Sequence, residues 1–198
     1  MPRNLDLDDR RRTVSEAAWR VLVRDGAAEL SVRKVAAEAG LPPSSLRYAF
    51  PTQASVRDAA VALLVSRLRE RVDRAARSAG GRDGARAVLL ELLPLDDERR
   101  VEMQVTVSFV ALALTDPSLR AAHERTHEAV REVCAQALAH LGAGVRPGVA
   151  GDAVARTDVE LTHAVVDGLA LHLLAQAPGT DASWAVAALD AHLDALTR

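Results

Sequence analysis

The fold is decided by one stretch near the N-terminus, Ser31-Val-Arg-Lys-Val-Ala-Ala-Glu-Ala-Gly40-Leu-Pro-Pro-Ser-Ser-Leu-Arg-Tyr-Ala-Phe50. Ser31 is a favourable N-cap for a short helix, and Gly40 is the residue type that most readily follows a helix end. Pro42 and Pro43 then open a second short helix, because a proline in the first turn forfeits no intrahelical hydrogen bond. Two short helices joined at a glycine form a helix–turn–helix, whose second helix can enter the major groove of DNA.

This motif predicts which residues contact DNA. The N-terminal residues of the second helix would meet base edges, and Arg47, one turn on, can reach a guanine or a phosphate. Phosphate contacts are expected from the start of the first helix, from the tyrosine hydroxyl, and from the start of the following helix with its free N–H groups. The predicted DNA-binding residues are Ser31, Arg33, Pro42, Pro43, Ser44, Ser45, Arg47, Tyr48, Thr52 and Gln53.

The rest of the chain also has helical periodicity, with apolar residues three and four positions apart and breakers between long runs. We expect an all-α fold of about nine helices, with a three-helix head joined by a long helix to a helical body. Residues 1–57 would form the DNA-binding domain, and residues 58–198 the ligand-binding and dimerisation domain. The predicted helices after the head are about 52–78, 82–93, 96–115, 117–141, 158–176 and 181–197, and the glycine-rich residues 142–157 should be the least structured.

Charge distribution agrees with this division better than net charge does. The net charge is only −2. Residues 1–57 contain ten Arg or Lys and seven Asp or Glu, whereas the remainder contains fifteen and twenty. A basic N-terminal part on a more acidic body has the sign expected when the head faces DNA.

The remaining composition limits the other classes of protein. No apolar run reaches the ~18 residues of a membrane span, and the N-terminus lacks the apolar run of a secretory signal, so we expect a cytoplasmic protein with no membrane partner. The single cysteine, Cys134, cannot form an internal disulfide and is expected to be buried. No pattern calls for a cofactor.

Residues 13–64 resemble the N-terminal domain of TetR-family regulators. The resemblance rests on Leu30-Ser-Val-Arg-Lys-Val-Ala36, on Glu38-Ala-Gly-Leu41 and on Leu46-Arg-Tyr-Ala-Phe-Pro-Thr-Gln53. It implies that Gln53 contacts phosphate. Ala49 departs from the family pattern, which commonly has an aromatic residue there. The C-terminal half is similar to the BetI-like subgroup through residues 94–100 and 167–172.

The resemblance also implies a homodimer and a small-molecule effector. The last two helices would pair with their symmetry mates as a four-helix bundle, through Leu161, Ala164, Val165, Gly168, Leu171, Ala175, Trp184, Leu189 and Leu193. A ligand pocket in the body would be lined by Met103, Val107, Phe109, Leu112, His127 and Asp167. The implied function is a repressor that leaves its double-stranded operator when the effector binds, and a ligand-dependent activator stays open as an alternative.

One enzyme-like motif competes with this interpretation. His123-Glu124-Arg125-Thr126-His127 matches the H-E-x-x-H pattern of zinc hydrolases, in which two imidazoles on one helix face bind the metal. A third ligand has no obvious candidate, because Glu128 and Glu132 lie on the same predicted helix. We therefore interpret the motif as part of a charged helix face and expect neither a metal site nor an enzyme.

Overall fold

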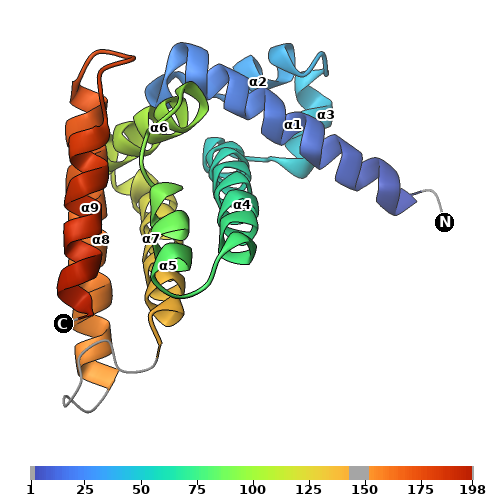
Figure 1. The fold of residues 1–198 in the computed structure, drawn as a ribbon. Helices are drawn as coiled ribbons and strands as arrows, with labels where there is room; N and C mark the ends of the chain where they lie inside the picture. Colours follow the sequence, from blue (N-terminus) through green and yellow to red (C-terminus); the bar gives the residue numbers. More distant parts are fainter. Residues whose placement is uncertain (1–2, 143–151, 198) are drawn as a thin grey trace. The chain divides into compact units, whose positions relative to one another are not determined.

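The computed structural model describes residues 3–142 and 152–197 of the chain. Within these ranges every regular element is a helix, which confirms the predicted all-α fold (Figure 1). The elements are α1 (Arg3–Asp25), η1 (Ala27–Glu29), α2 (Val32–Glu38), α3 (Pro43–Ala49), α4 (Gln53–Ser78), α5 (Gly81–Leu90), α6 (Asp97–Ala113), η2 (Pro117–Leu119), α7 (Arg120–His140), α8 (Asp152–Ala175) and α9 (Ser183–Leu196).

Two helix boundaries differ from the sequence prediction. Helix α8 begins at Asp152, so part of the segment that we expected to be least structured is helical. Helix α1 begins at Arg3 and continues as far as Asp25, just before Gly26. The residues before Thr13 are mostly charged, and the apolar stripe that reveals an amphipathic helix is therefore weak there.

The described chain packs as two units, each interrupted in sequence. The first contains the residues up to Ser66 together with Val105–Thr126, and the second contains Arg67–Gln104 and the residues after Thr126. Helix α4 therefore contributes its first half to one unit and its second half to the other. The functional boundary that we placed at residue 57 stays a prediction.

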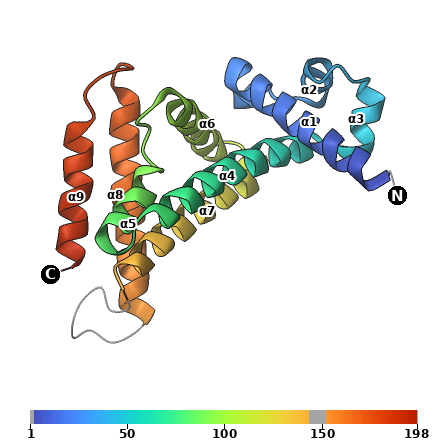
Figure 2. The ribbon, with the colours of Figure 1, turned by 45° about the vertical axis from the view of Figure 1, so that its right-hand side comes forward.

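The first unit contains the head, which we define as α1, η1, α2 and α3. Helix α1 lies across α2 and α3 (Figure 2), and its predicted apolar stripe is fully buried at Val14, Ala17, Ala18 and Val21. Small side chains on both partners, with Ala36 of α2 also fully buried, let the helices approach closely. Val35 of α2 and Leu46 and Phe50 of α3 are buried as well.

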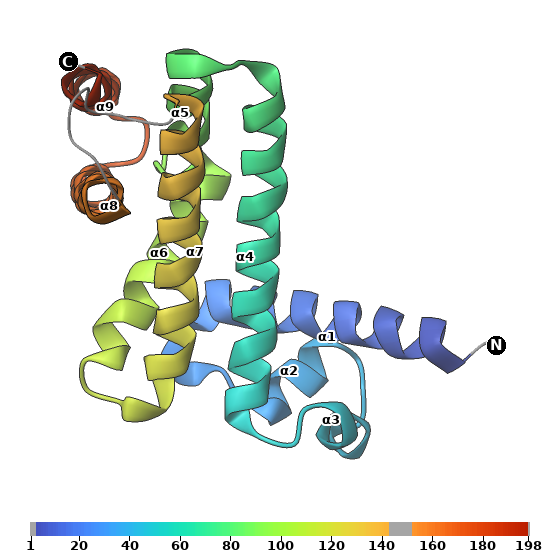
Figure 3. The same cartoon turned by 90° about the horizontal axis from the view of Figure 1, so that it is seen from below.

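The second unit has its own core, to which α4, α5, α7, α8 and α9 all contribute buried apolar side chains. Leu89, Leu93, Leu189 and Leu193 are fully buried in it, and Cys134 is buried as expected. Helices α8 and α9 run side by side, as Figures 1 and 3 both show.

Two arginines of the second unit have enclosed side chains. Arg71 on α4 bonds Glu102 on α6 at 2.6 Å, with the two side chains only 14% and 6% exposed. Arg100 donates to the carbonyl oxygens of Leu173 and Leu174 in the last turn of α8. Both arginines therefore join separate helices of this unit.

No helix among the described residues is long and apolar enough to cross a membrane.

Candidate nucleic-acid interface

Hydrogen bonds fix the backbone conformation at both ends of α2, including the turn that leads to α3. Ser31 caps α2 by accepting a hydrogen bond from the N–H of Lys34. At the other end, the N–H of Leu41 donates to the Ala36 carbonyl at 2.9 Å, and the N–H of Gly40 donates to Ala37 at 3.2 Å. This pair of bonds is the Schellman motif, and it requires a residue with positive φ, here Gly40 at 66°. The glycine therefore sets the angle at which the chain enters α3.

Helix α3 is anchored on one side and open on the other. Leu46 and Phe50 are buried, with exposures of 1% and 8%, and they attach the helix to the head. Pro42 is the N-cap, Pro43 is the first helical residue, and both are exposed together with Ser44. The N-terminal end predicted to meet base edges is therefore accessible.

Three further DNA contacts were predicted on α3. Ser45 is half-buried. The side chains of Arg47 and Tyr48 lie outside the described residues, so their predicted contacts stay predictions.

The start of α4 is fixed by two reciprocal hydrogen bonds. The Thr52 hydroxyl accepts from the N–H of Ser55, and the Ser55 hydroxyl accepts from the N–H of Thr52, as in a capping box. The backbone N–H groups of the first helical residues, Gln53 and Ala54, precede any intrahelical acceptor and can serve an anion. Ser55 was not among the predicted residues, although its spacing from Thr52 is the sequence signal of such a box.

Gln53 lies where a phosphate contact was predicted, but its side chain already has a partner. Its Nε2 donates to the carbonyl oxygen of Leu30 at 2.6 Å. The amide therefore links the start of α4 to the residue before Ser31. A phosphate contact by Gln53 would use its backbone N–H.

Four of the seven head cations whose side chains are described, Arg12, Arg20, Arg24 and Lys34, are in ion pairs. Arg20 and Arg24 both bond Glu38 at 2.7 Å, and Lys34 bonds Glu29 at 2.8 Å. Hydrogen bonds from Arg24 and then Arg20 lower the pKa of the Glu38 carboxyl. Arg33 is exposed on α2 and takes part in no ion pair among the described side chains of the head.

The predicted dimer residues divide into a surface set and a buried set. Leu161, Ala164, Gly168, Leu171 and Ala175 are all exposed along α8, Val165 is half-buried, and Trp184 is 38% exposed on α9. Leu189 and Leu193 are fully buried within the protomer. They therefore belong to its core and offer no surface to a second chain, which corrects their assignment.

The predicted pocket residues are divided between the two units. In the first unit, Phe109 is fully buried and Val107 and Leu112 are half-buried. In the second unit, Met103 packs against the core, whereas His127 and Asp167 are exposed.

His127 and Asp167 both contact His163, a buried residue that sequence reasoning missed. The imidazole ring of His163 lies 4.5 Å from that of His127, and its Nε2 lies 3.3 Å from Oδ2 of Asp167. Burial lowers the pKa of His163, although Asp167 acts in the opposite direction. Among the residues that the structure describes, no three His, Cys, Asp or Glu side chains are grouped as metal ligands, and the H-E-x-x-H motif gains no third ligand there.

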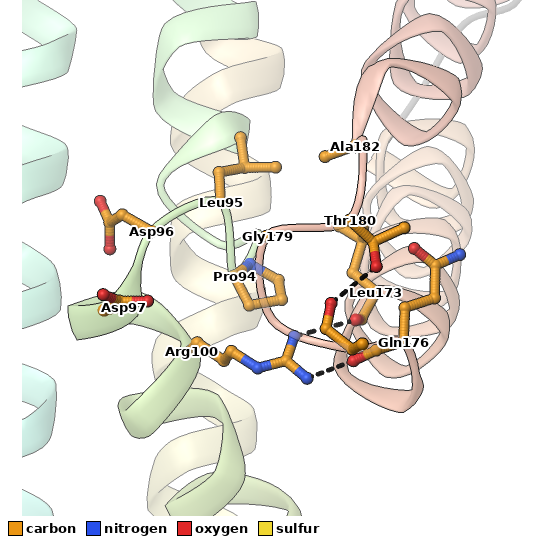
Figure 4. A pocket seen from close by; sticks show the side chains of 11 residues that line it. Pro94, Leu95, Asp96, Asp97, Arg100, Leu173, Gln176, Gly179, Thr180 and Ala182 are labelled. Carbon is orange, nitrogen blue, oxygen red and sulfur yellow. Dashed lines mark hydrogen bonds between the residues drawn. The ribbon is translucent and has the colours of Figure 1, made fainter.

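A cavity of about 140 Å³ lies where α6 begins and α8 ends (Figure 4). Arg100 extends along it toward the C-terminal carbonyls of α8, and none of the six predicted pocket residues lines it. Its lining consists of Pro94, Leu95, Asp96, Asp97, Arg100, Leu173, Gln176, Ala177, Gly179, Thr180 and Ala182.

The all-helical fold and the exposed, proline-started α3 define the class of helix–turn–helix DNA-binding regulators. Comparisons with known proteins identify the family. Residues 81–198 match the C-terminal domain of BetI-type transcriptional repressors, a TetR-type domain. The HTH-type transcriptional regulator PksA of Bacillus subtilis (strain 168) is 30% identical over 175 residues, which are 88% of this chain and 83% of PksA.

Solved structures agree with the sequence matches. A transcriptional regulator from Rhodococcus sp. Rha1 is 27% identical, with a TM-score of 0.74 over 94% of this chain and 95% of that one. The multidrug binding protein EbrR, solved as a complex with imidazole, is 26% identical, with a TM-score of 0.63 over 92% of this chain and 94% of EbrR. The chain belongs to the TetR family of transcriptional regulators.

Proposed function

We propose that the protein is a repressor that binds operator DNA as a homodimer and leaves it when a small molecule binds to the body. The observation that carries the proposal is the geometry of α3. Its buried residues, Leu46 and Phe50, fix it to the head, while Pro42, Pro43 and Ser44 are exposed at its N-terminal end. Small exposed residues at that end let the backbone come close to base edges in the major groove.

Around α3 we assign the phosphate contacts to three kinds of group. Arg33 supplies an exposed guanidinium that pairs with no described carboxylate of the head. The capped start of α4 supplies the N–H groups of Gln53 and Ala54. Arg47 and Tyr48 complete the set on the basis of sequence, with Arg47 serving either a guanine or a phosphate.

The homodimer is supported by the exposed face of α8. Leu161 and Leu171 are 46% and 51% exposed, and Ala164, Gly168 and Ala175 lie between or beside them at intervals of three and four residues. That alternation of large and small residues is the pattern by which one helix accepts another at close range. A dimer holds two copies of α3 at a fixed separation, so that both engage one duplex.

The effector is proposed to be a small molecule held by the body. EbrR was solved with a small heterocycle bound, which supports this role for the same fold. Met103, Val107, Phe109, Leu112, His127 and Asp167 stay candidates for contact with such a molecule. An effector that releases DNA must bind the non-binding conformation more tightly, because DNA and effector then compete through one equilibrium. Since the partner is genomic DNA, the proposal places the protein in the cytoplasm.

The test uses a duplex that the wild-type protein itself selects from a pool of random-sequence DNA. Arg47→Ala should weaken binding to that duplex by roughly 1–3 kcal/mol, because a bidentate base contact or a phosphate contact is lost. The measurement is a gel shift at several salt concentrations, with circular dichroism to verify the fold.

Sedimentation of the wild-type complex should give two chains for each duplex. The logarithm of the affinity should fall with the logarithm of the salt concentration by about 0.9 for each phosphate contacted. A flat salt response would exclude DNA as the partner, and an unchanged affinity for Arg47→Ala would remove α3 from the interface.

A further inference from the structure

The N-terminal part of α1 extends beyond the other helices of the head. The first buried residue of α1 with a described side chain is Val14, and residues 9–13 are all exposed. In Figures 1 and 3 this end of the helix projects past α2 and α3, and α3 lies nearer to it than α2 does. The extension therefore lies on the side of the head from which α3 emerges.

Three consecutive arginines occupy this extension, and they do not share one face. Arg10 and Arg11 precede Val14 by four and three residues, so they lie on the helix face that packs on the head one turn later. Arg12 lies on the opposite face and bonds Asp9 at 3.0 Å. The first two arginines thus continue the head-facing stripe past the edge of the head.

Arg10 and Arg11 also have no ion-pair partner among the side chains that the structure describes. Between Asp9 and Phe50, the ion pairs of the described side chains involve Arg12, Arg20, Arg24 and Lys34 but neither Arg10 nor Arg11. Two adjacent exposed guanidiniums repel each other, and each gains from a nearby anion. A duplex entered by α3 presents a row of phosphates beside the groove.

We infer that Arg10 and Arg11 bind phosphates of the DNA backbone that flank the groove entered by α3. This inference rests on the proposed function and adds a contact outside the helix–turn–helix. The contact carries no base information, so it strengthens binding to every sequence to the same degree. It also fixes the orientation of the head on the duplex, because α1 contacts the backbone at a point separate from α3.

The test compares Arg10→Ala/Arg11→Ala with Arg12→Ala on the duplex selected by the wild-type protein and on a random-sequence duplex. Alanine is the best helix former, so each variant should keep α1 intact. Loss of two phosphate contacts should reduce the log–log salt slope by about 1.8. Between about 50 and 200 mM salt, the affinity of the double variant should therefore fall about tenfold less than that of the wild type, on both duplexes. Arg12→Ala should keep the wild-type slope.

A lysine variant separates phosphate binding from base reading. Arg10→Lys/Arg11→Lys keeps both charges and should retain the wild-type salt slope. Ethylation of the contacted phosphates should weaken binding of the wild-type protein and leave binding of the alanine variant unaffected. A wild-type slope in the alanine variant, or a lysine variant as weak as the alanine variant, overturns the inference while DNA binding itself stands. If the wild-type protein selects no duplex, the proposed function and this inference fail together.

Discussion

Arginine has different surroundings in the head and in the second unit. In the head, Arg20 and Arg24 keep half or more of their side-chain surface exposed while they bond Glu38. In the second unit, Arg71 and Arg100 are enclosed, one against Glu102 and the other against the C-terminal carbonyls of α8. Exposed pairs contribute little to stability and are screened by salt, whereas an enclosed charge depends on its partner. Arg20 and Arg24 can therefore exchange partners for an anion, whereas the enclosed Arg71 and Arg100 cannot.

The largest expected effect breaks the enclosed pair. Glu102→Ala should lower the free energy of unfolding by about 3 kcal/mol, because the enclosed Arg71 guanidinium loses its shortest ion pair and keeps only the longer one to Glu91 among the described side chains. Arg71→Met together with Glu102→Leu should recover most of the loss, since no buried charge is then left unpaired. Urea denaturation measures both.

Glu38→Ala is the matched control from the head, and it should change the unfolding free energy far less, because its arginine partners stay solvated. Equal losses of unfolding free energy in Glu102→Ala and Glu38→Ala would contradict the difference between enclosed and exposed ion pairs.

The next prediction tests whether the stability of the head depends more on the backbone of its turn than on its ion pairs. Gly40→Ala should lower the free energy of unfolding by about 1–2 kcal/mol, because an L side chain is strained at a φ of 66°. A Cβ atom at this position would meet no other atom within 4 Å, so the loss reports backbone strain alone. Gly40→Asn should lose less, since asparagine tolerates this conformation. Hydrogen exchange of the α2 and α3 amides should rise in the alanine variant, and an unchanged exchange rate would exclude strain at the turn.

The smallest effect concerns the enclosed histidines of the second unit. Burial lowers the pKa of His163 and of His192 below the ordinary 6.5. At His163, the charges of Asp167 and Glu160 oppose this shift, and those of His127 and Arg131 add to it. At His192, the charge of Asp158 opposes it. The native state then binds fewer protons than the unfolded state below that pH. The contribution of these two histidines to stability is therefore fully present above about pH 6.5 and is lost as the pH falls through their lowered pKa values.

The measurement is the free energy of unfolding against pH. His163→Gln should make the loss below pH 6.5 shallower, because the buried imidazole that resists protonation is gone. His172→Gln, on an exposed residue of α8, is the control and should follow the wild type. A wild-type profile in His163→Gln would show that this histidine does not contribute.

Local signals in the sequence explain why the head could be predicted and the body only in part. Ser31, Gly40 and Pro43 act on backbone groups within a few residues of themselves, and each occupies its expected position in the structure. Helix α9 gives no such signal, because Trp184 and several alanines make its outer face as apolar as the inner face of Leu189 and Leu193. When both faces are apolar, periodicity cannot tell which one is the core.

Local sequence patterns also could not predict contacts between residues that are distant in the chain. The bond from Gln53 to Leu30 and the stacking of His127 on His163 join segments whose spacing is set only by the folded chain. The same holds for the cavity beside Arg100, since its walls come from two separate connections between helices. Local propensity carries no information on such contacts.

The amide of Gln53 ties together the two ends of the helix–turn–helix. Because its bond to Leu30 joins the residue before Ser31 to the first residue of α4, α2 and α3 lie in a closed loop with both ends held. A loop held in this way has few conformations to lose when it docks on a partner, so less of the interaction energy is spent on ordering it. The head would then associate with a duplex nearly as a rigid body, and long-range attraction between arginines and phosphates would govern how fast the two meet.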